Sequence, residues 1–226
     1  MNTPWLDIAL SLDGFVAALF LVTGLNVIVV RQMLAALYLF IIHAVLLASS
    51  AIVLAVALGS IHLGWVAVIT IVTKVVAVPV IVRWSAGSQV YKRREVDQVL
   101  SIPISLLAAA ALALAAWMSI TPLVHSISDR PFAAINLPTG LMTVFFGALT
   151  VAVRREGVAQ LMGLLIMESG AFFASISIVP DLPVIAEIAA AVDVPVAALV
   201  IGLLIRNIDR LTGTTRVGLL AGLKER

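Results

Sequence analysis

The sequence predicts an all-α protein, a polytopic membrane helix bundle of about seven transmembrane helices. Of its 226 residues, 62% are apolar and only 12% are charged, whereas about 25% of the residues of soluble domains are charged. The mean hydropathy is +1.18, and several apolar runs exceed the roughly 20 residues that a helix needs to cross a bilayer. We therefore expect residues 1–226 to form a single integral-membrane domain.

Turn residues and charged residues separate the expected spans. The breaks include a proline-bearing segment at 121–137 and the pair Arg154-Arg155. The first span carries Asp7 and Asp13 and has no basic segment before it, so we expect a retained transmembrane helix and not a cleaved signal peptide. The seven expected spans are 8–30, 33–58, 62–83, 98–120, 138–153, 157–178 and 184–205.

The basic residues indicate how the chain is oriented. Seven spans place the two termini on opposite sides, and with the N-terminus outside, twelve of the 14 Lys and Arg residues lie on the inner side. The positive-inside rule requires this distribution, so we expect a multi-pass protein of the cell inner (plasma) membrane with a cytoplasmic C-terminus. The pI of 9.4 is then a consequence of topology, and no nucleic-acid partner is expected. The twelve residues are Arg31, Arg83, Lys92, Arg93, Arg94, Arg154, Arg155, Arg206, Arg210, Arg216, Lys224 and Arg226.

Two groups of three spans share a plan. In each group the first span ends in a basic motif, "VIVVRQ" or "VAVRRE", the second has one polar residue near its middle, and the third has a charge followed by a proline. One span separates the groups, so both have the same direction and we expect a parallel 3+1+3 repeat. The expected units are 1–83, an alanine-rich linker helix 98–120 that packs through small side chains, 138–205, and a cytoplasmic tail 206–226.

Four ionisable residues fall at one depth in the predicted membrane. At about 1.5 Å per residue, they lie about 14–18 Å from the inner ends of their spans, near the middle of a hydrocarbon core about 30 Å thick. A charged side chain there costs about 2.5–3.5 kcal/mol, so such side chains turn inward and find partners. The four residues are Lys74, His43, Glu168 and Asp193.

This layer has two interpretations. In the first, Lys74 forms a salt bridge with Asp193 or Glu168 that only holds the bundle together. In the second, the layer is a polar corridor in the membrane plane through which protons pass with the help of water. His43 is then either a proton relay, because its unperturbed pKa is near neutrality, or a bonded packing residue. A proline follows Lys74 after five residues and Asp193 after two, and each proline leaves backbone carbonyls without an N–H partner. The locally broken helix then either admits water or is only kinked.

Three motifs around these residues resemble a known family. They are "ITIVTKVVAVPVIVRW" around Lys74, "QLMGLLIMESGAFFA" around Glu168, and "EIAAAVDVPVAALVIGLLIRNIDRL" around Asp193. With the C-terminal "LLAGLKER", the chain resembles over essentially its full length component E of the formate hydrogenlyase and group 4 hydrogenase complexes (HyfE-like). The last three spans also resemble the small K subunit of respiratory complex I (NuoK-like). That subunit carries two membrane carboxylates; the second corresponds to Asp193, and the first aligns with Leu165, one helical turn from Glu168, so we expect Glu168 to take its role.

The resemblance implies a non-catalytic membrane-arm subunit of an oxidoreductase complex. Lys74, Glu168, Asp193 and His43 would belong to a proton (or sodium) translocation path, while a soluble arm carries out electron transfer. The implied partners are antiporter-like and other membrane-arm subunits, cytoplasmic hydrogenase-like and iron–sulfur subunits, and the lipid bilayer.

The chain itself is not expected to hold a cofactor. It has no cysteine for an iron–sulfur cluster and only one histidine inside a span, where bis-histidine haem ligation needs two. It also lacks zinc-type histidine spacing and a phosphate-binding glycine loop, so we do not expect a self-contained enzyme. Two alternatives remain open, namely a subunit of a cation/proton antiporter assembly without a redox partner and a structural membrane scaffold.

Overall fold

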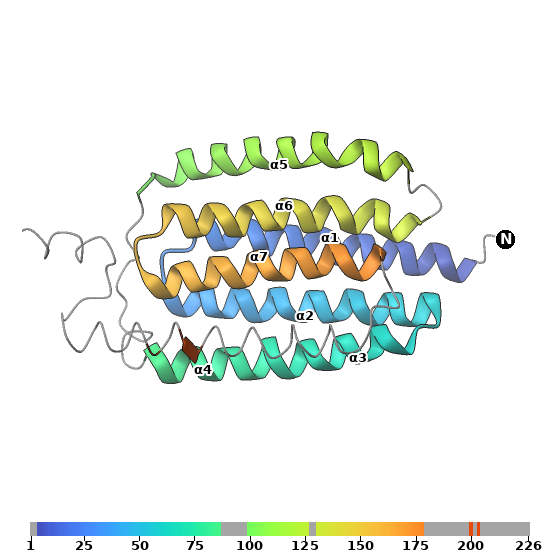
Figure 1. The fold of residues 1–226 in the computed structure, drawn as a ribbon, viewed down its shortest axis with the longest axis horizontal. Helices are drawn as coiled ribbons and strands as arrows, with labels where there is room; N and C mark the ends of the chain where they lie inside the picture. The colour runs from blue at the N-terminus through green and yellow to red at the C-terminus, as the bar shows by residue number, and fades with distance from the viewer. Residues whose placement is uncertain (1–3, 87–98, 127–129, 179–198, 201–202, 204–226) are drawn as a thin grey trace, which may run out of the picture.

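The structure, a computed structural model, describes residues 4–86, 99–126, 130–178, 199–200 and 203. All of its elements are helices, and they lie roughly alongside one another (Figure 1). The helices are α1 (Pro4–Val29), α2 (Met33–Leu58), α3 (Ile61–Thr70), the π-helical segment η1 (Ile71–Ala77), α4 (Val78–Ala86), α5 (Ile102–Ser126), α6 (Pro131–Val153) and α7 (Gly157–Ile178).

Six segments of the described chain are long and apolar enough to cross a membrane. One of them, Ile61–Trp84, joins α3, η1 and most of α4 into a continuous helix. The expected helical membrane bundle is therefore confirmed, and the six segments correspond to the first six expected spans. The seventh expected span, 184–205, lies largely outside the described residues, and so does Asp193.

A break does fall within the expected segment 121–137, but its bounds are wrong, because the prolines in and next to that segment do not end the helices. Pro122 lies inside α5, which continues to Ser126. Pro131 lies at the start of α6, where its missing N–H would have no partner in any case. Pro138 lies inside α6, and membrane helices tolerate such prolines because neighbouring groups satisfy the freed carbonyls. The fifth span therefore begins at residue 131 instead of 138.

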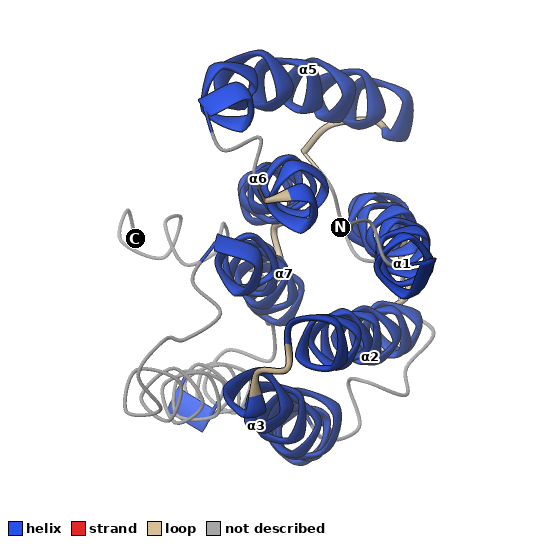
Figure 2. Cartoon of the chain, turned by 90° about the vertical axis from the view of Figure 1, so that its right-hand side faces the viewer, coloured by secondary structure: helices blue, strands red, loops and turns tan. Residues whose placement is uncertain are grey.

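Four helices form a central bundle. α1 contacts α2 and α6, α7 contacts the same two helices, and together they close a ring when seen end-on (Figure 2). α5 lies outside this ring against α6 and α1, and α3 lies outside it against α2. The expectation that the fourth span packs through small side chains is confirmed, since the buried residues of α5 are Ser105, Ala109 and Ala116.

One end of the bundle carries the basic residues Arg31, Arg83, Arg154 and Arg155, and we call it the basic end. Arg154 follows α6, yet its guanidinium donates to the carbonyls of Val27, Ile28 and Val30 at the end of α1. The turn between α1 and α2 and the turn between α6 and α7 therefore lie together. At the opposite end Arg130 donates to the carbonyl of Ile178, the last residue of α7. Each of these arginines thus satisfies helix C-terminal carbonyls, which otherwise lack partners.

Glycines bring α6 and α7 into close contact. Gly140 on α6 faces Gly170 on α7, and Gly147 on α6 faces Gly163 on α7. The two glycines of each helix are seven residues apart in the sequence. A Cβ atom at Gly140 would lie 2.5 Å from the Gly170 carbonyl oxygen, and one at Gly147 would lie 2.6 Å from the Gly163 carbonyl oxygen. In a membrane, small residues at such spacing let helix backbones approach and gain van der Waals contact. The glycines therefore fix the position of α7 in the bundle.

We predict that Gly147→Ala destabilises the protein, because the new methyl group meets backbone atoms that cannot move aside. Overpacking of this kind costs about 1–3 kcal/mol, and the expected result is a lower thermal unfolding temperature in detergent. Gly64→Ala on α3 is the matched control, since nothing lies within 4 Å of its added Cβ atom. Equal unfolding temperatures for the two variants would contradict the close approach of α6 and α7.

Candidate functional site

Lys74 and Glu168 form an ion pair between η1 and α7. Lys74 is the one buried residue of η1, and its side chain is only 6% exposed. Its ammonium group donates to Oε2 of Glu168 and, at 3.2 Å, to the Ser169 hydroxyl. It also lies 5.3 Å from the ring centroid of Phe172, within cation–π range. Among the residues that the structure describes, Lys74 thus has three partners, all on α7.

The backbone around Lys74 is π-helical. In η1 the hydrogen bonds reach one residue further than in an α-helix, and the N–H of Val78 donates to the Thr73 carbonyl. Pro79 follows directly and has no N–H for the preceding turn. π-helical turns inside α-helices are rare and often occur at functional sites. The helix therefore continues through the lysine–proline motif with a locally wider turn.

The position of Glu168 follows from the glycine contact of α7. Residues two apart on an α-helix point about 200° away from each other. Because Gly170 faces α6, Glu168 points to the other side of α7, toward η1. Its side chain is 29% exposed, whereas that of Lys74 is 6% exposed. The carboxylate is therefore the more accessible member of the ion pair.

His43 on α2 is fully buried and has its own set of partners. Its Nδ1 lies 2.8 Å from the Thr23 hydroxyl, and that hydroxyl donates to the Phe20 carbonyl. In the tautomer in which Nδ1 carries the hydrogen of the imidazole, Nδ1 donates to the Thr23 oxygen and Nε2 is an acceptor. Nε2 is buried and has no hydrogen-bond partner. The ring stacks on Phe20, with the ring centroids 3.7 Å apart.

The sequence predicted that Lys74, His43, Glu168 and Asp193 lie at one level. The structure brings Lys74 and Glu168 into direct contact. His43 is bonded to Thr23 and makes no hydrogen bond to either of them. Asp193 lies outside the described residues. Among the described residues, no group of three or more His, Cys, Asp and Glu side chains is arranged to hold a metal ion.

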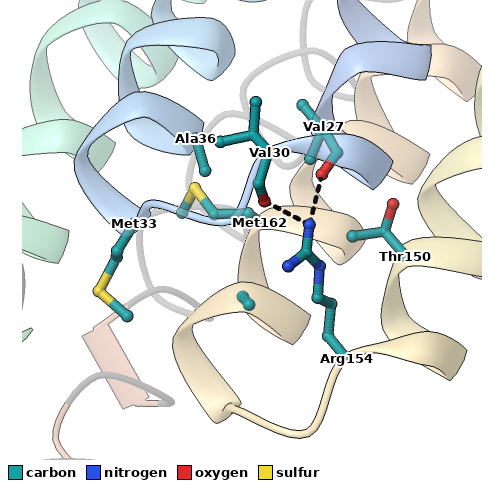
Figure 3. A pocket seen from close by; sticks show the side chains of 8 residues that line it. Val27, Val30, Met33, Ala36, Thr150, Arg154 and Met162 are labelled. Carbon is teal, nitrogen blue, oxygen red and sulfur yellow. Dashed lines mark hydrogen bonds between the residues drawn. The ribbon is translucent and has the colours of Figure 1, made fainter. Parts of the chain in front are cut away.

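Arg154 is a buried cation that the sequence analysis placed on the surface as a topology signal. It is 3% exposed, whereas Arg155 beside it is exposed. Its guanidinium lies beside a pocket of about 10 Å³ lined by Val30, Met33 and Met162, among others (Figure 3). This is about the volume that one water molecule requires, and Nη1 has no hydrogen-bond partner among the described residues. Burial lowers the pKa of Arg154 to about 10, and the nearby Glu156 limits the fall, so the guanidinium is charged at neutral pH.

The sequence analysis also missed a polar cluster on three helices. The Ser50 hydroxyl on α2 and the Asn136 amide nitrogen on α6 lie within hydrogen-bond distance of the carboxyl oxygens of Asp13 on α1, and all three residues are buried. The signal available was weak, because Ser50 and Asn136 are uncharged and lie in apolar stretches of the sequence. Asp13 itself was visible, but the sequence analysis used it only as evidence against a cleaved signal peptide.

Comparisons with known proteins give one partial match. No protein-family model matches the chain, and no solved structure matches it. The chain is similar to a protein of Mycobacterium tuberculosis named "Uncharacterized protein Rv0085", with 25% identity over 161 residues. The match covers 71% of this chain and 72% of that protein. The name states no activity, so the function must be argued from the site.

We predict that removing one member of the ion pair destabilises the protein more than removing both. Breaking a buried pair leaves an uncompensated charge and costs about 3–5 kcal/mol. Lys74→Met and Glu168→Gln should each lower the unfolding temperature, with the larger effect for Glu168→Gln because it leaves the more deeply buried ammonium unpaired. The double variant should recover much of the loss. Additive losses, measured as a double-mutant cycle of unfolding free energies, would show that the two groups are not coupled.

We predict that Arg154→Met destabilises the protein by roughly 1.5–3 kcal/mol, the usual contribution of hydrogen bonds made by a charged group. The carbonyls at the end of α1 would lose their donor. Arg155→Met, which changes an exposed neighbour with the same chemistry, is the matched control. Denaturation in detergent measures both, and equal stability of the two variants would contradict the capping role.

Proposed function

We propose that this protein is a membrane-arm subunit of a group 4 hydrogenase, formate hydrogenlyase or complex I-like oxidoreductase. In this proposal it contributes buried ionisable residues to a proton (or sodium) translocation path that is coupled to electron transfer elsewhere in the complex. The observation that carries the proposal is the Lys74–Glu168 ion pair, which joins two apolar helices and has one accessible carboxylate. The resemblance of the surrounding motifs to HyfE-like and NuoK-like subunits supplies the kind of complex.

The ion pair provides a simple way to control a proton. A nearby ammonium favours the ionised form of a carboxylate, so moving Lys74 away from Glu168 increases the affinity of Glu168 for a proton. The wider π-helical turn around Lys74 supports such a movement, because backbone bonding there already departs from the regular ladder. In this scheme Glu168 takes or releases the proton and Lys74 sets when it does so.

The other two predicted residues extend the path. His43 offers a buried acceptor, Nε2, that has no partner within the described protein, which is the state a proton relay needs. Asp193 is proposed as the second carboxylate of the path on the strength of the NuoK-like motif alone. A structural scaffold would need the ion pair but would have no use for an unpartnered histidine nitrogen.

We further propose the finer topology of seven spans with a parallel 3+1+3 repeat. The contact of Arg154 with the end of α1 supports it, because the hairpins α1–α2 and α6–α7 then have the same direction. The basic end would be cytoplasmic by the positive-inside rule, with the N-terminus outside and the membrane being the cell inner membrane. Antiporter-like membrane subunits and cytoplasmic hydrogenase-like and iron–sulfur subunits would be the partners.

The main test is a transport assay on membrane vesicles that contain the native complex. Lys74→Ala and Asp193→Asn should abolish ion translocation coupled to electron transfer, because each removes a charge from the path, while the complex still assembles. Asp7→Asn, an exposed carboxylate on α1, should leave translocation unchanged.

Normal pumping by both Lys74→Ala and Asp193→Asn would leave only a structural role. Purification of the native complex separates the proposed function from the antiporter alternative. Co-migrating hydrogenase-like and iron–sulfur subunits support the redox complex, whereas antiporter subunits alone would overturn it in favour of a cation/proton antiporter assembly.

A further inference from the structure

A second carboxyl group is buried in the central bundle and lies apart from the Lys74–Glu168 ion pair. Asp13 on α1 is 0% exposed. The Ser50 hydroxyl on α2 lies 2.5 Å from its Oδ1, and the Asn136 amide nitrogen on α6 lies 2.8 Å from its Oδ2. Three of the four helices of the ring therefore meet at one carboxyl group. At about 1.5 Å per residue, Asp13 is about 24 Å from the end of α1 at the basic end, whereas His43 is about 15 Å from that end of α2.

No counter-charge accompanies Asp13 in the described part of the chain. Besides Asp13, the described titratable residues of α1 and of the helices packed against it, α2, α5, α6 and α7, are Asp7, Tyr38, His43, His125 and Glu168. None of them forms a hydrogen bond or an ion pair with Asp13. An ionised carboxylate without a cation in an apolar interior costs several kcal/mol, and such a group is neutralised instead.

We propose that Asp13, Ser50 and Asn136 form a proton-binding site, in which the Asp13 carboxyl group holds a proton at neutral pH. The site is separate from the ion pair and would remain if the function proposed above were wrong. Its ligand is a single proton, bound by one carboxyl group and oriented by two neutral side chains from neighbouring helices.

The neutral form fits the observed positions of the heavy atoms. When Oδ1 carries the proton, the carboxyl O–H of Asp13 donates a hydrogen bond to the Ser50 oxygen across the 2.5 Å contact. The hydrogen of the Ser50 hydroxyl then turns to a backbone carbonyl of the preceding helical turn, as serine hydroxyls in helices commonly do. The neighbouring Ser49 already donates to the carbonyl of Val45 in this way. The Asn136 amide continues to donate to Oδ2, so both oxygens of Asp13 keep a partner.

A metal ion fits the same atoms less well. Hard cations bind oxygen ligands at about 2.3–2.6 Å or shorter and must lie between them. Ser50 and Asn136 instead touch Asp13 directly at hydrogen-bond distance. Asn136 also presents its N–H to the carboxyl group, while its oxygen has no partner. An N–H donor stabilises a carboxyl oxygen and repels a cation, so the geometry favours a proton.

Infrared spectroscopy of the full-length protein in lipid nanodiscs tests this inference without any transport assay or partner subunit. We expect a carbonyl stretch of a protonated carboxyl group at pH 7 that shifts in D₂O and disappears in Asp13→Asn. Asp7→Asn, which changes an exposed aspartate on the same helix, should keep the band. Ser50→Ala retains the carboxyl group but removes its hydrogen-bond partner, so the band should shift to higher frequency.

Three results would overturn the site. The first is a spectrum at pH 7 in which neither Asp13→Asn nor Ser50→Ala alters a protonated-carboxyl band, since Asp13 is then ionised. The second is loss of the band on adding Na⁺ but not K⁺, since a cation then competes for the carboxylate. The third is a band assigned to Asp13 in wild type that Ser50→Ala leaves unshifted, since the proposed partner is then wrong. Each of these outcomes is independent of whether Lys74 and Glu168 take part in transport.

Discussion

The requirement that a lysine in an apolar bundle must have an anion beside it constrains the rest of this structure. Within the described part of the chain, Lys74 has its partners on a single neighbouring helix, α7, which supplies the carboxylate of Glu168, the Ser169 hydroxyl and the Phe172 ring. An ammonium group left without them would cost about 2.5–3.5 kcal/mol or more in the membrane. The position of α7 relative to η1 is therefore not free, and the other contacts of α7 have to be compatible with it.

Helix α7 contacts α6 with one face and η1 with another. One face carries Gly163 and Gly170 and lies against the glycines of α6 at backbone distance. The other face carries Glu168 toward η1. Close glycine packing leaves no side chain that could yield, so a rotation of α7 that moved the carboxylate would also separate the two backbones. The steric contact on one side thus maintains the electrostatic contact on the other.

Much of the bundle could be predicted from the sequence, because apolar length and charge position act on each span separately. The six described spans, and the expectation that Lys74 turns inward and finds a charged partner, follow from such local rules. The features that the sequence analysis missed depend on contacts between helices, which the sequence of one span does not show. The break at 121–137 was expected to be longer than it is, because α5 continues through Pro122 and α6 already begins at Pro131. Nothing local distinguishes buried Arg154 from exposed Arg155. The partners of Asp13 are more than thirty residues away along the chain.

The two members of the ion pair differ in exposure. Lys74 is enclosed, and among the described residues its direct partners are all on α7. Glu168 has 29% of its side chain exposed and can meet water or a group from a neighbouring subunit. A buried ion pair is most stable when both charges are fully bonded, so the structural alternative does not account for this asymmetry. The proposed function does account for it, because that function needs one accessible carboxylate with a shielded cation behind it.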